Sequence, residues 1–153
     1  MASFEQSSLA NLQIANCMFS EIPSTIRDFP QLVTLTAQNS MLYEWDSDAA
    51  VSKHSNPSLR TIKLLDVDLK SVSLGLVTEP LPSAMEVIVL RNLNVMIFVD
   101  MVGSNWQFVK IFNCGSCGLT AVPTVVQTMS HLTVLVLRDN LIKNVGDGAL
   151  ESA

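Results

Sequence analysis

The sequence predicts an α/β repeat fold. Each repeat adds one short strand to a curved parallel β-sheet and returns by an irregular, 3₁₀ or short helical segment. Three observations predict this fold. One spacing of apolar residues recurs six times, the copies begin 23 to 27 residues apart, and the longest apolar runs, at 87–90 and 134–137, are only strand-sized. The 153 residues have the length of a single domain, which we expect to span 1–153.

The first copy of the repeat sets the frame. Positions 1, 4, 6, 9, 11, 14, 18 and 21 hold apolar residues or cysteine, and proline follows position 14. In the first copy these residues are Leu9, Leu12, Ile14, Cys17, Phe19, Ile22, Pro23, Ile26 and Phe29. A later copy matches it throughout with Val109, Phe112, Cys114, Cys117, Leu119, Val122, Pro123, Val126 and Met129.

The other four copies keep the same frame over positions 1 to 14. They comprise Leu32, Leu35, Ala37, Ser40, Leu42 and Trp45; Leu59, Ile62, Leu64, Val67, Leu69 and Val72; Met85, Ile88, Leu90, Leu93, Val95 and Phe98; and Leu132, Leu135, Leu137, Asn140, Ile142 and Val145. The six copies therefore begin near residues 9, 32, 59, 85, 109 and 132.

The spacing has a physical explanation. Positions 4 and 6 alternate with polar or exposed neighbours, as a half-buried strand requires. Position 9 turns the chain out of the strand, and the later positions point inward from the convex side. Pro23 and Pro123 lie on this return segment, where a missing N–H costs little. Because one repeat cannot bury its own apolar face, neighbouring repeats must stack into one core.

This pattern resembles the leucine-rich-repeat family from Leu9 to Val145. The resemblance implies a solenoid of about six repeats whose concave sheet binds a protein or peptide. The chain departs from the family at position 9, which is usually Asn. That column reads Cys17, Ser40, Val67, Leu93, Cys117 and Asn140. Since Val67 and Leu93 cannot form side-chain hydrogen bonds, we expect less regular turns in the middle repeats.

Two connections are longer than the rest. Residues 46–58 are polar and rich in turn-forming residues, so they predict a convex loop. Residues 73–84 contain Pro80 and Pro82, which argue against a long helix there.

The sequence offers little for catalysis or metal binding. Cys114 and Cys117 form a C-x-x-C pair without further zinc ligands, and their repeat positions point inward, so we interpret them as core thiols. His54 and His131 are not placed to serve them. The pairs Asp46/Asp48 and Asp66/Asp68 lack the remaining ligands of a calcium loop. We therefore expect no enzyme activity, no metal and no cofactor.

Composition narrows the partners and the compartment. The net charge of −5 disfavours nucleic acid, and no apolar run is long enough for membrane insertion by this segment. Three cysteines and the lack of a usable Asn-x-Ser/Thr sequon favour a reducing compartment such as the cytoplasm, with an extracellular ectodomain fragment as the open alternative.

The outward strand positions form the candidate ligand-binding face. Its predicted residues are Lys63, Leu65, Val87, Val89, Arg91, Ile111, Asn113, Val134, Val136 and Arg138. Val87, Ile111 and Val134 form one row, and Val89 and Val136 lie in the next. With the flanking positions, the face holds five basic and three acidic residues, a net +2, while the rest of the chain carries −7. This asymmetry predicts a protein or peptide partner of apolar and acidic character.

Two functions compete at this point. The first is a protein-recognition module that binds its ligand on the concave face. The alternative is a sensor or ectodomain segment of a receptor-like kinase or another multidomain signalling enzyme; a purely architectural spacer is a third interpretation. Neither end of the chain carries a convincing polar cap, so we expect a fragment of a longer protein, with self-association through uncapped ends as a further prediction.

Overall fold

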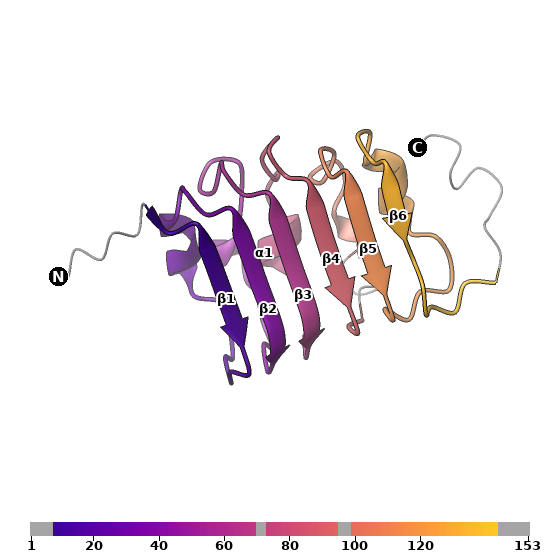
Figure 1. Cartoon of the computed structure of the whole chain (residues 1–153), viewed down its shortest axis with the longest axis horizontal. Helices are drawn as coiled ribbons and strands as arrows, with labels where there is room; N and C mark the ends of the chain where they lie inside the picture. The colour runs from indigo at the N-terminus through magenta and orange to yellow at the C-terminus, as the bar shows by residue number, and fades with distance from the viewer. Residues whose placement is uncertain (1–7, 70–72, 95–98, 144–153) are drawn as a thin grey trace.

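The strands of this protein form one parallel sheet in chain order. The computed structural model describes residues 8–69, 73–94 and 99–143, and within them six strands pair as β1-β2-β3-β4-β5-β6 (Figure 1). The strands are β1 (Asn11–Ala15), β2 (Thr34–Ser40), β3 (Thr61–Val67), β4 (Val87–Arg91), β5 (Ile111–Gly115) and β6 (Val134–Val136). The predicted parallel sheet is confirmed, with one strand in each predicted copy of the frame.

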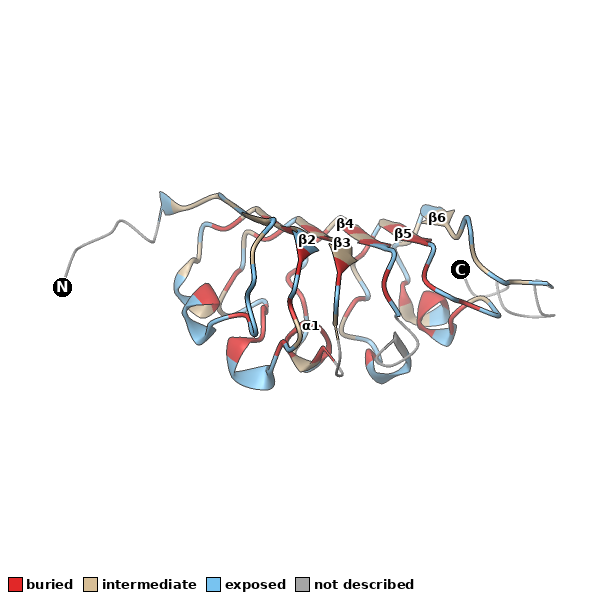
Figure 2. Ribbon diagram, turned by 90° about the horizontal axis from the view of Figure 1, so that it is seen from below, coloured by how far each residue is buried: buried red, intermediate tan, exposed pale blue. Residues whose placement is uncertain are grey.

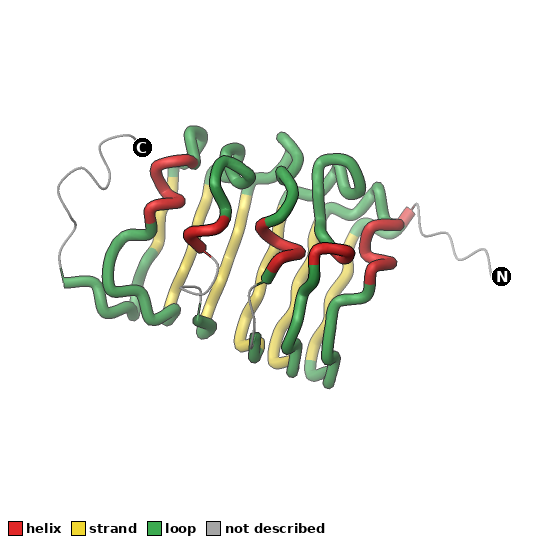
Figure 3. The backbone as a smooth tube through the Cα atoms, turned by 180° about the vertical axis from the view of Figure 1, so that it is seen from behind, coloured by secondary structure: helices red, strands yellow, loops and turns green. Residues whose placement is uncertain are grey.

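The connections run over one face of the sheet only (Figure 3). They contain the 3₁₀ segments η2 (Ser24–Asp28), η3 (Ser47–Ala49), η5 (Val99–Met101) and η6 (Thr124–Thr128), and the single-turn helix α1 (Leu74–Val77). Pro23 and Pro123 immediately precede η2 and η6 in extended conformation, as a proline at the start of a helical turn allows. The four-residue length of α1 agrees with the prediction that residues 73–84 hold no long helix.

The hydrophobic core lies between the sheet and these connections (Figure 2). Frame positions 4 and 6 pair in register across the strands, so that Ile62 lies beside Ile88, and Ile88 beside Phe112. All three side chains are fully buried. Phe112 also meets Trp106 edge to face, with ring centroids 6.0 Å apart. Inward side chains of successive strands thus fill one continuous core.

Two buried tryptophans link the connections to one another. The Trp45 indole N–H donates to the Ala49 carbonyl at 2.8 Å, and that of Trp106 donates to the Leu76 carbonyl at 2.9 Å. Both donors are therefore satisfied although both residues have no exposed surface. Gly75 lies directly against the Trp45 ring, because a Cβ added there would fall 2.0 Å from Trp45 Cδ1.

Every strand has a residue in the left-handed region of backbone space at or just beyond its carboxyl end. These residues are Asn16, Asn39, Asp66, Asn92, Ser116 and Asp139, with φ between 47° and 58°. Each occupies position 8 of the frame. Asn and Asp tolerate this conformation better than other non-glycine residues, because their short polar side chains bond locally. All six copies thus share one left-handed backbone conformation at the same position of the frame.

This regularity corrects the expectation for the middle repeats. Val67 and Leu93 are buried and cannot bond the backbone, yet Asp66 and Asn92 before them have the same φ of 55° as Asn16. The residue at position 8, and not the one at position 9, is what all six turns have in common. A buried apolar side chain at position 9 can therefore stand in place of a hydrogen-bonding one, and the left-handed conformation at position 8 stays the same.

Polar residues at position 9 do bond the neighbouring turn. Asn140 accepts from the N–H groups of Cys117 at 2.9 Å and Leu119 at 3.1 Å, and its amide donates to the carbonyl of Cys114 at 2.7 Å. Ser40 accepts from the Cys17 N–H at 3.3 Å. These bonds join consecutive turns.

Residues 46–58 form the expected loop, with the short η3 segment inside it, but part of this loop packs inward. Its His54 is exposed, but Ser52 and Asn56 are fully buried. The Asn56 amide donates to the carbonyls of Ile26 at 3.0 Å and Phe29 at 3.2 Å, and its oxygen accepts from the Ser52 N–H. The segment packs inward because its polar groups satisfy backbone groups of the preceding connection.

Four predicted frame residues, Val72, Val95, Phe98 and Val145, lie outside the described residues.

Candidate functional site

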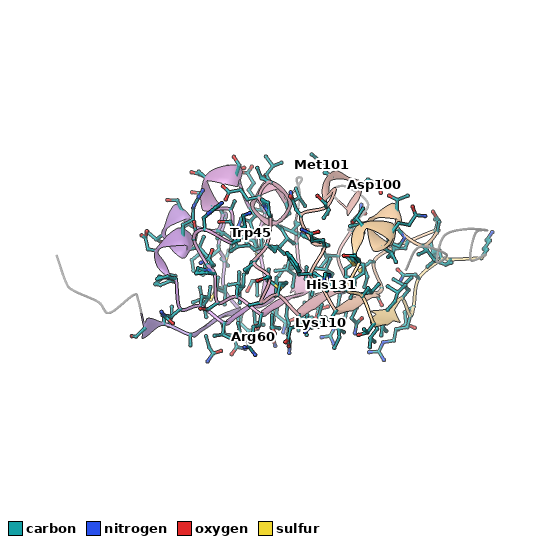
Figure 4. The ribbon with its side chains drawn as sticks, turned by 90° about the horizontal axis from the view of Figure 1, so that it is seen from above. Trp45, Arg60, Asp100, Met101, Lys110 and His131 are labelled. Carbon is teal, nitrogen blue, oxygen red and sulfur yellow. The ribbon has the colours of Figure 1, made fainter. Side chains whose placement is uncertain are left out.

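The sheet face opposite the helical connections is the candidate site, and we call it the open face. Figure 4 shows Arg60 and Lys110 on this side of the sheet and Asp100 and Met101 on the helical side. The strand register arranges its outward residues in three rows. The first is Asn11, Thr34, Thr61, Val87, Ile111 and Val134; the second is Gln13, Thr36, Lys63, Val89, Asn113 and Val136; the third is Ala15, Gln38, Leu65, Arg91 and Gly115.

The first row supplies the apolar part of the face. Val87 is the Cα partner of Ile111, and Ile111 is the partner of Val134, so three apolar residues stand side by side. Val87 and Ile111 are half-buried, and Val134 is 43% exposed. The predicted row is confirmed as a continuous strip across β4, β5 and β6.

The second row is interrupted. Asn113 stands between Val89 and Val136, because it is the Cα partner of both. The apolar surface predicted from Val89 and Val136 is therefore split by one amide. This amide adds a donor and an acceptor at the centre of the C-terminal half of the open face.

Arginines border the face at the carboxyl ends of the strands. Leu65 is the partner of Arg91, which in turn pairs with Gly115. Arg138 follows β6 and covers Gly115, since a Cβ added to that glycine would lie 3.8 Å from Arg138 Cγ. All ten predicted ligand-binding residues thus lie on or at the rim of one face, with polar residues toward β1 and apolar residues toward β6.

Two of the five basic side chains on this face, Arg91 and Lys110, have acidic partners from the neighbouring repeat. Arg91 lies 3.6 Å from Asp66, which also accepts from the Asn92 amide at 2.9 Å. Lys110 lies 3.7 Å from Glu86. These pairs are solvent-exposed, so they orient the side chains more than they stabilise the fold.

Arg138 and Lys63 differ from these paired cations. The partner of Arg138 is its neighbour in sequence, Asp139, at 4.0 Å, and both side chains are about 70% exposed. In the described part of the chain, Lys63 forms no ion pair although it is half-buried.

The C-x-x-C pair lies in the core and not on the open face. Cys114 and Cys117 are free thiols with 0% and 1% exposure, which agrees with the inward positions predicted for them. The Cys117 thiol donates to the carbonyls of Leu90 at 3.4 Å and Gly115 at 3.3 Å. A side-chain hydrogen bond with Cys117, and then burial, raise the pKa of Cys114 well above its ordinary value. Both sulfurs therefore act as small core groups.

Among the described residues, neither histidine side chain forms a hydrogen bond with Cys114 or Cys117. His131 is exposed, with Nδ1 3.1 Å from the Gln107 carbonyl and its ring 5.2 Å from that of Phe108. His54 lies exposed in the connection after β2.

One acidic group was not predicted. Glu21, Glu44 and Asp46 are exposed, and one carboxylate oxygen from each lies within 4.8 Å of the others. Glu21 and Glu44 form a parallel bridge between adjacent connections. They occupy the same position of consecutive copies, so the fixed repeat length was the signal that could have revealed them. Exposed acidic groups of this kind are common without a bound cation.

A hollow of about 480 Å³ lies beside the turns at the carboxyl ends of β3, β4 and β5. It is lined by Val67, Asp68, Leu69, Asn92, Leu93, Asn94, Ser116, Cys117 and Gly118. None of the ten predicted ligand-binding residues lines it. Within the described ranges, no helix is long and apolar enough to cross a membrane.

Comparison with known proteins gives no identification: no family model matches the chain, and a search of curated proteins finds no match either.

Proposed function

We propose that this protein is a leucine-rich-repeat solenoid that recognises a protein or peptide on its open face and carries out no catalysis of its own. The parallel strands in chain order support the solenoid, as does the left-handed residue at position 8 of each copy of the frame. In such an architecture each unit contacts only its neighbours, which leaves one long sheet face for a ligand.

The apolar strip of Val87, Ile111 and Val134 carries the proposal. These residues are accessible on the sheet face that no helix covers, with the charged residues Glu86 and Lys110 on one side and Asn113 in the next row on the other. An apolar centre with a polar rim is the arrangement found at protein interfaces. The strip also extends across three strands, or about 10 Å at the usual spacing between neighbouring strands.

The test replaces Val87, Ile111 and Val134 together with Ser. Peptides are first selected from a random phage-displayed library on the immobilised wild-type chain, and the affinity of synthesised peptides is then measured by calorimetry. We expect the triple variant to bind these peptides at least about tenfold more weakly, because burying three apolar side chains supplies several kcal/mol.

A matched control replaces Met18, Met41 and Met101, which are exposed and lie outside the strands, with Ser. This variant should bind the selected peptides like the wild type. Far-UV circular dichroism and urea midpoints establish that both variants fold. Equal binding by the folded strip variant and the wild type would refute the open face as the binding surface.

A further inference from the structure

β3 is the strand at which the open face changes from polar to apolar. Thr36 precedes Lys63 in the second row, and Val89 follows it. Thr61, the outward residue before Lys63 on the same strand, pairs with Val87 of the apolar strip. Lys63 therefore lies at the boundary between the polar and the apolar half of the open face.

Lys63 differs from its neighbours in having no acidic partner. Arg91 and Lys110 are held by Asp66 and Glu86, at 3.6 and 3.7 Å. Within the described chain, Lys63 has no carboxylate within ion-pair distance. A ligand that uses Arg91 or Lys110 must displace or share an existing carboxylate, whereas a ligand that uses Lys63 displaces only water.

The surroundings of Lys63 favour an anion. The hydroxyls of Thr36 and Thr61 flank it on the face, and in the described residues neither of them has a hydrogen-bond partner. Hydroxyls donate to carboxylates, and hydrogen bonds that involve two ionised groups are shorter and stronger than neutral ones. Arg60, directly before β3, forms no ion pair with any described residue and adds positive potential beside the same strand.

We propose that Lys63 is the specificity-determining residue of the open face and binds an Asp or Glu side chain of the ligand. This inference rests on the proposed function. The apolar strip then receives a large apolar side chain of the same peptide. With strands about 4.8 Å apart and about 3.3 Å between residues, the Cα atoms of Lys63 and Ile111 are about 12 Å apart. Asp or Glu should therefore stand three or four residues from the apolar side chain in an extended peptide.

The experiment uses peptides selected on the full wild-type chain as above. Two features are expected: enriched sequences carry Asp or Glu three or four residues from a large apolar residue, and Lys63→Met weakens binding about tenfold or more. Methionine keeps the apolar stem of the side chain and removes its charge. Lys63→Arg, which keeps the charge, should retain most of the affinity.

Lys110→Met is the matched control, because it removes a cation that Glu86 already neutralises. Its effect should stay within about twofold. Affinity should also fall with added salt for the wild type and much less for Lys63→Met. If the strip variant loses binding while Lys63→Met binds like the wild type, or if the enriched peptides lack acidic residues, the role of Lys63 is refuted and the proposed function stands. If the library yields no peptide whose binding is weakened in the strip variant, the proposed function itself is contradicted.

Discussion

Two buried serines show how the environment of a single side chain decides its contribution. Ser40 and Ser73 are 4% and 0% exposed. The Ser40 hydroxyl donates to the Gln38 carbonyl at 2.9 Å and accepts from the Cys17 N–H. The Ser73 hydroxyl has no hydrogen-bond partner among the described residues. A buried polar group without a partner loses its bonds to water and gains nothing in return.

The two serines should therefore respond in opposite ways to the same substitution. Ser40→Ala leaves the Cys17 N–H without its acceptor and should lower the free energy of unfolding by about 1–3 kcal/mol. Ser73→Ala removes an unsatisfied hydroxyl and should leave stability unchanged or raise it. Urea denaturation followed by circular dichroism measures both values. A loss of stability in Ser73→Ala as large as that in Ser40→Ala would contradict this account.

At the scale of elements, close contacts between successive connections decide how the convex side packs. Helix α1 follows β3 and η3 follows β2, yet Gly75 of α1 lies against Trp45 just before η3. The Gly75 N–H also donates to the Trp45 carbonyl at 2.8 Å. The position needs the absence of a side chain, since it allows one connection to rest on the indole of the previous one.

Gly75→Ala should therefore be destabilising. The added Cβ would lie 2.0 Å from the buried Trp45 ring, which cannot move without disturbing its hydrogen bond to Ala49. We expect a loss of about 1–3 kcal/mol of unfolding free energy from overpacking. Gly115→Ala is the control, because a Cβ there meets its nearest neighbours at 3.7–3.8 Å, an ordinary contact. Similar urea midpoints for the two variants would contradict this prediction, because they would mean that the Trp45 ring shifts to admit the added methyl group at little cost in stability.

The elements differ in how far the sequence alone predicts them. The alternation of apolar residues places strand residues such as Ile62 and Leu64 on the inner face and Lys63 on the outer face, because the period of a strand is fixed by its backbone. The inward return of residues 46–58 was missed, since Asn56 bonds the carbonyls of Ile26 and Phe29, 30 and 27 residues earlier. A local pattern contains no information about such contacts.

The same distinction applies to the candidate site. Which residues share the open face follows from the frame, and the row of Val87, Ile111 and Val134 could be predicted from it. The unpaired state of Lys63 could not, because it depends on the lateral positions of Asp66 and Glu86 and on which cation each of them holds. Ion pairs between strands are set by side-chain reach across the sheet, and spacing along the sequence does not determine it.

For the whole molecule, the position of a strand in the sheet should decide its resistance to opening. Among the described strands, β3 and β4 each pair with a strand on both sides, whereas β1 and β6 each pair with one. Their inward residues differ as well, because Ile62 and Ile88 are fully buried while Leu12 and Leu135 are half-buried. An opening of β1 or β6 thus exposes less apolar surface.

Native-state hydrogen exchange measured by mass spectrometry tests this difference. Amides of β3 and β4 should exchange slowly, close to the rate set by global unfolding, and those of β1 and β6 should exchange faster through local opening. Exchange at one uniform rate in all six strands would indicate a molecule that opens only as a unit.

The common turn after each strand has a consequence for how this protein can change. Since Asn92 and Ser116 share the same backbone conformation, a genetic crossover between these two points joins chains whose directions already agree. A block of one strand with its return segment can be lost, duplicated or exchanged without creating a new junction geometry. The open face can thus vary one strand at a time, and the apolar strip and Lys63 can be inherited separately.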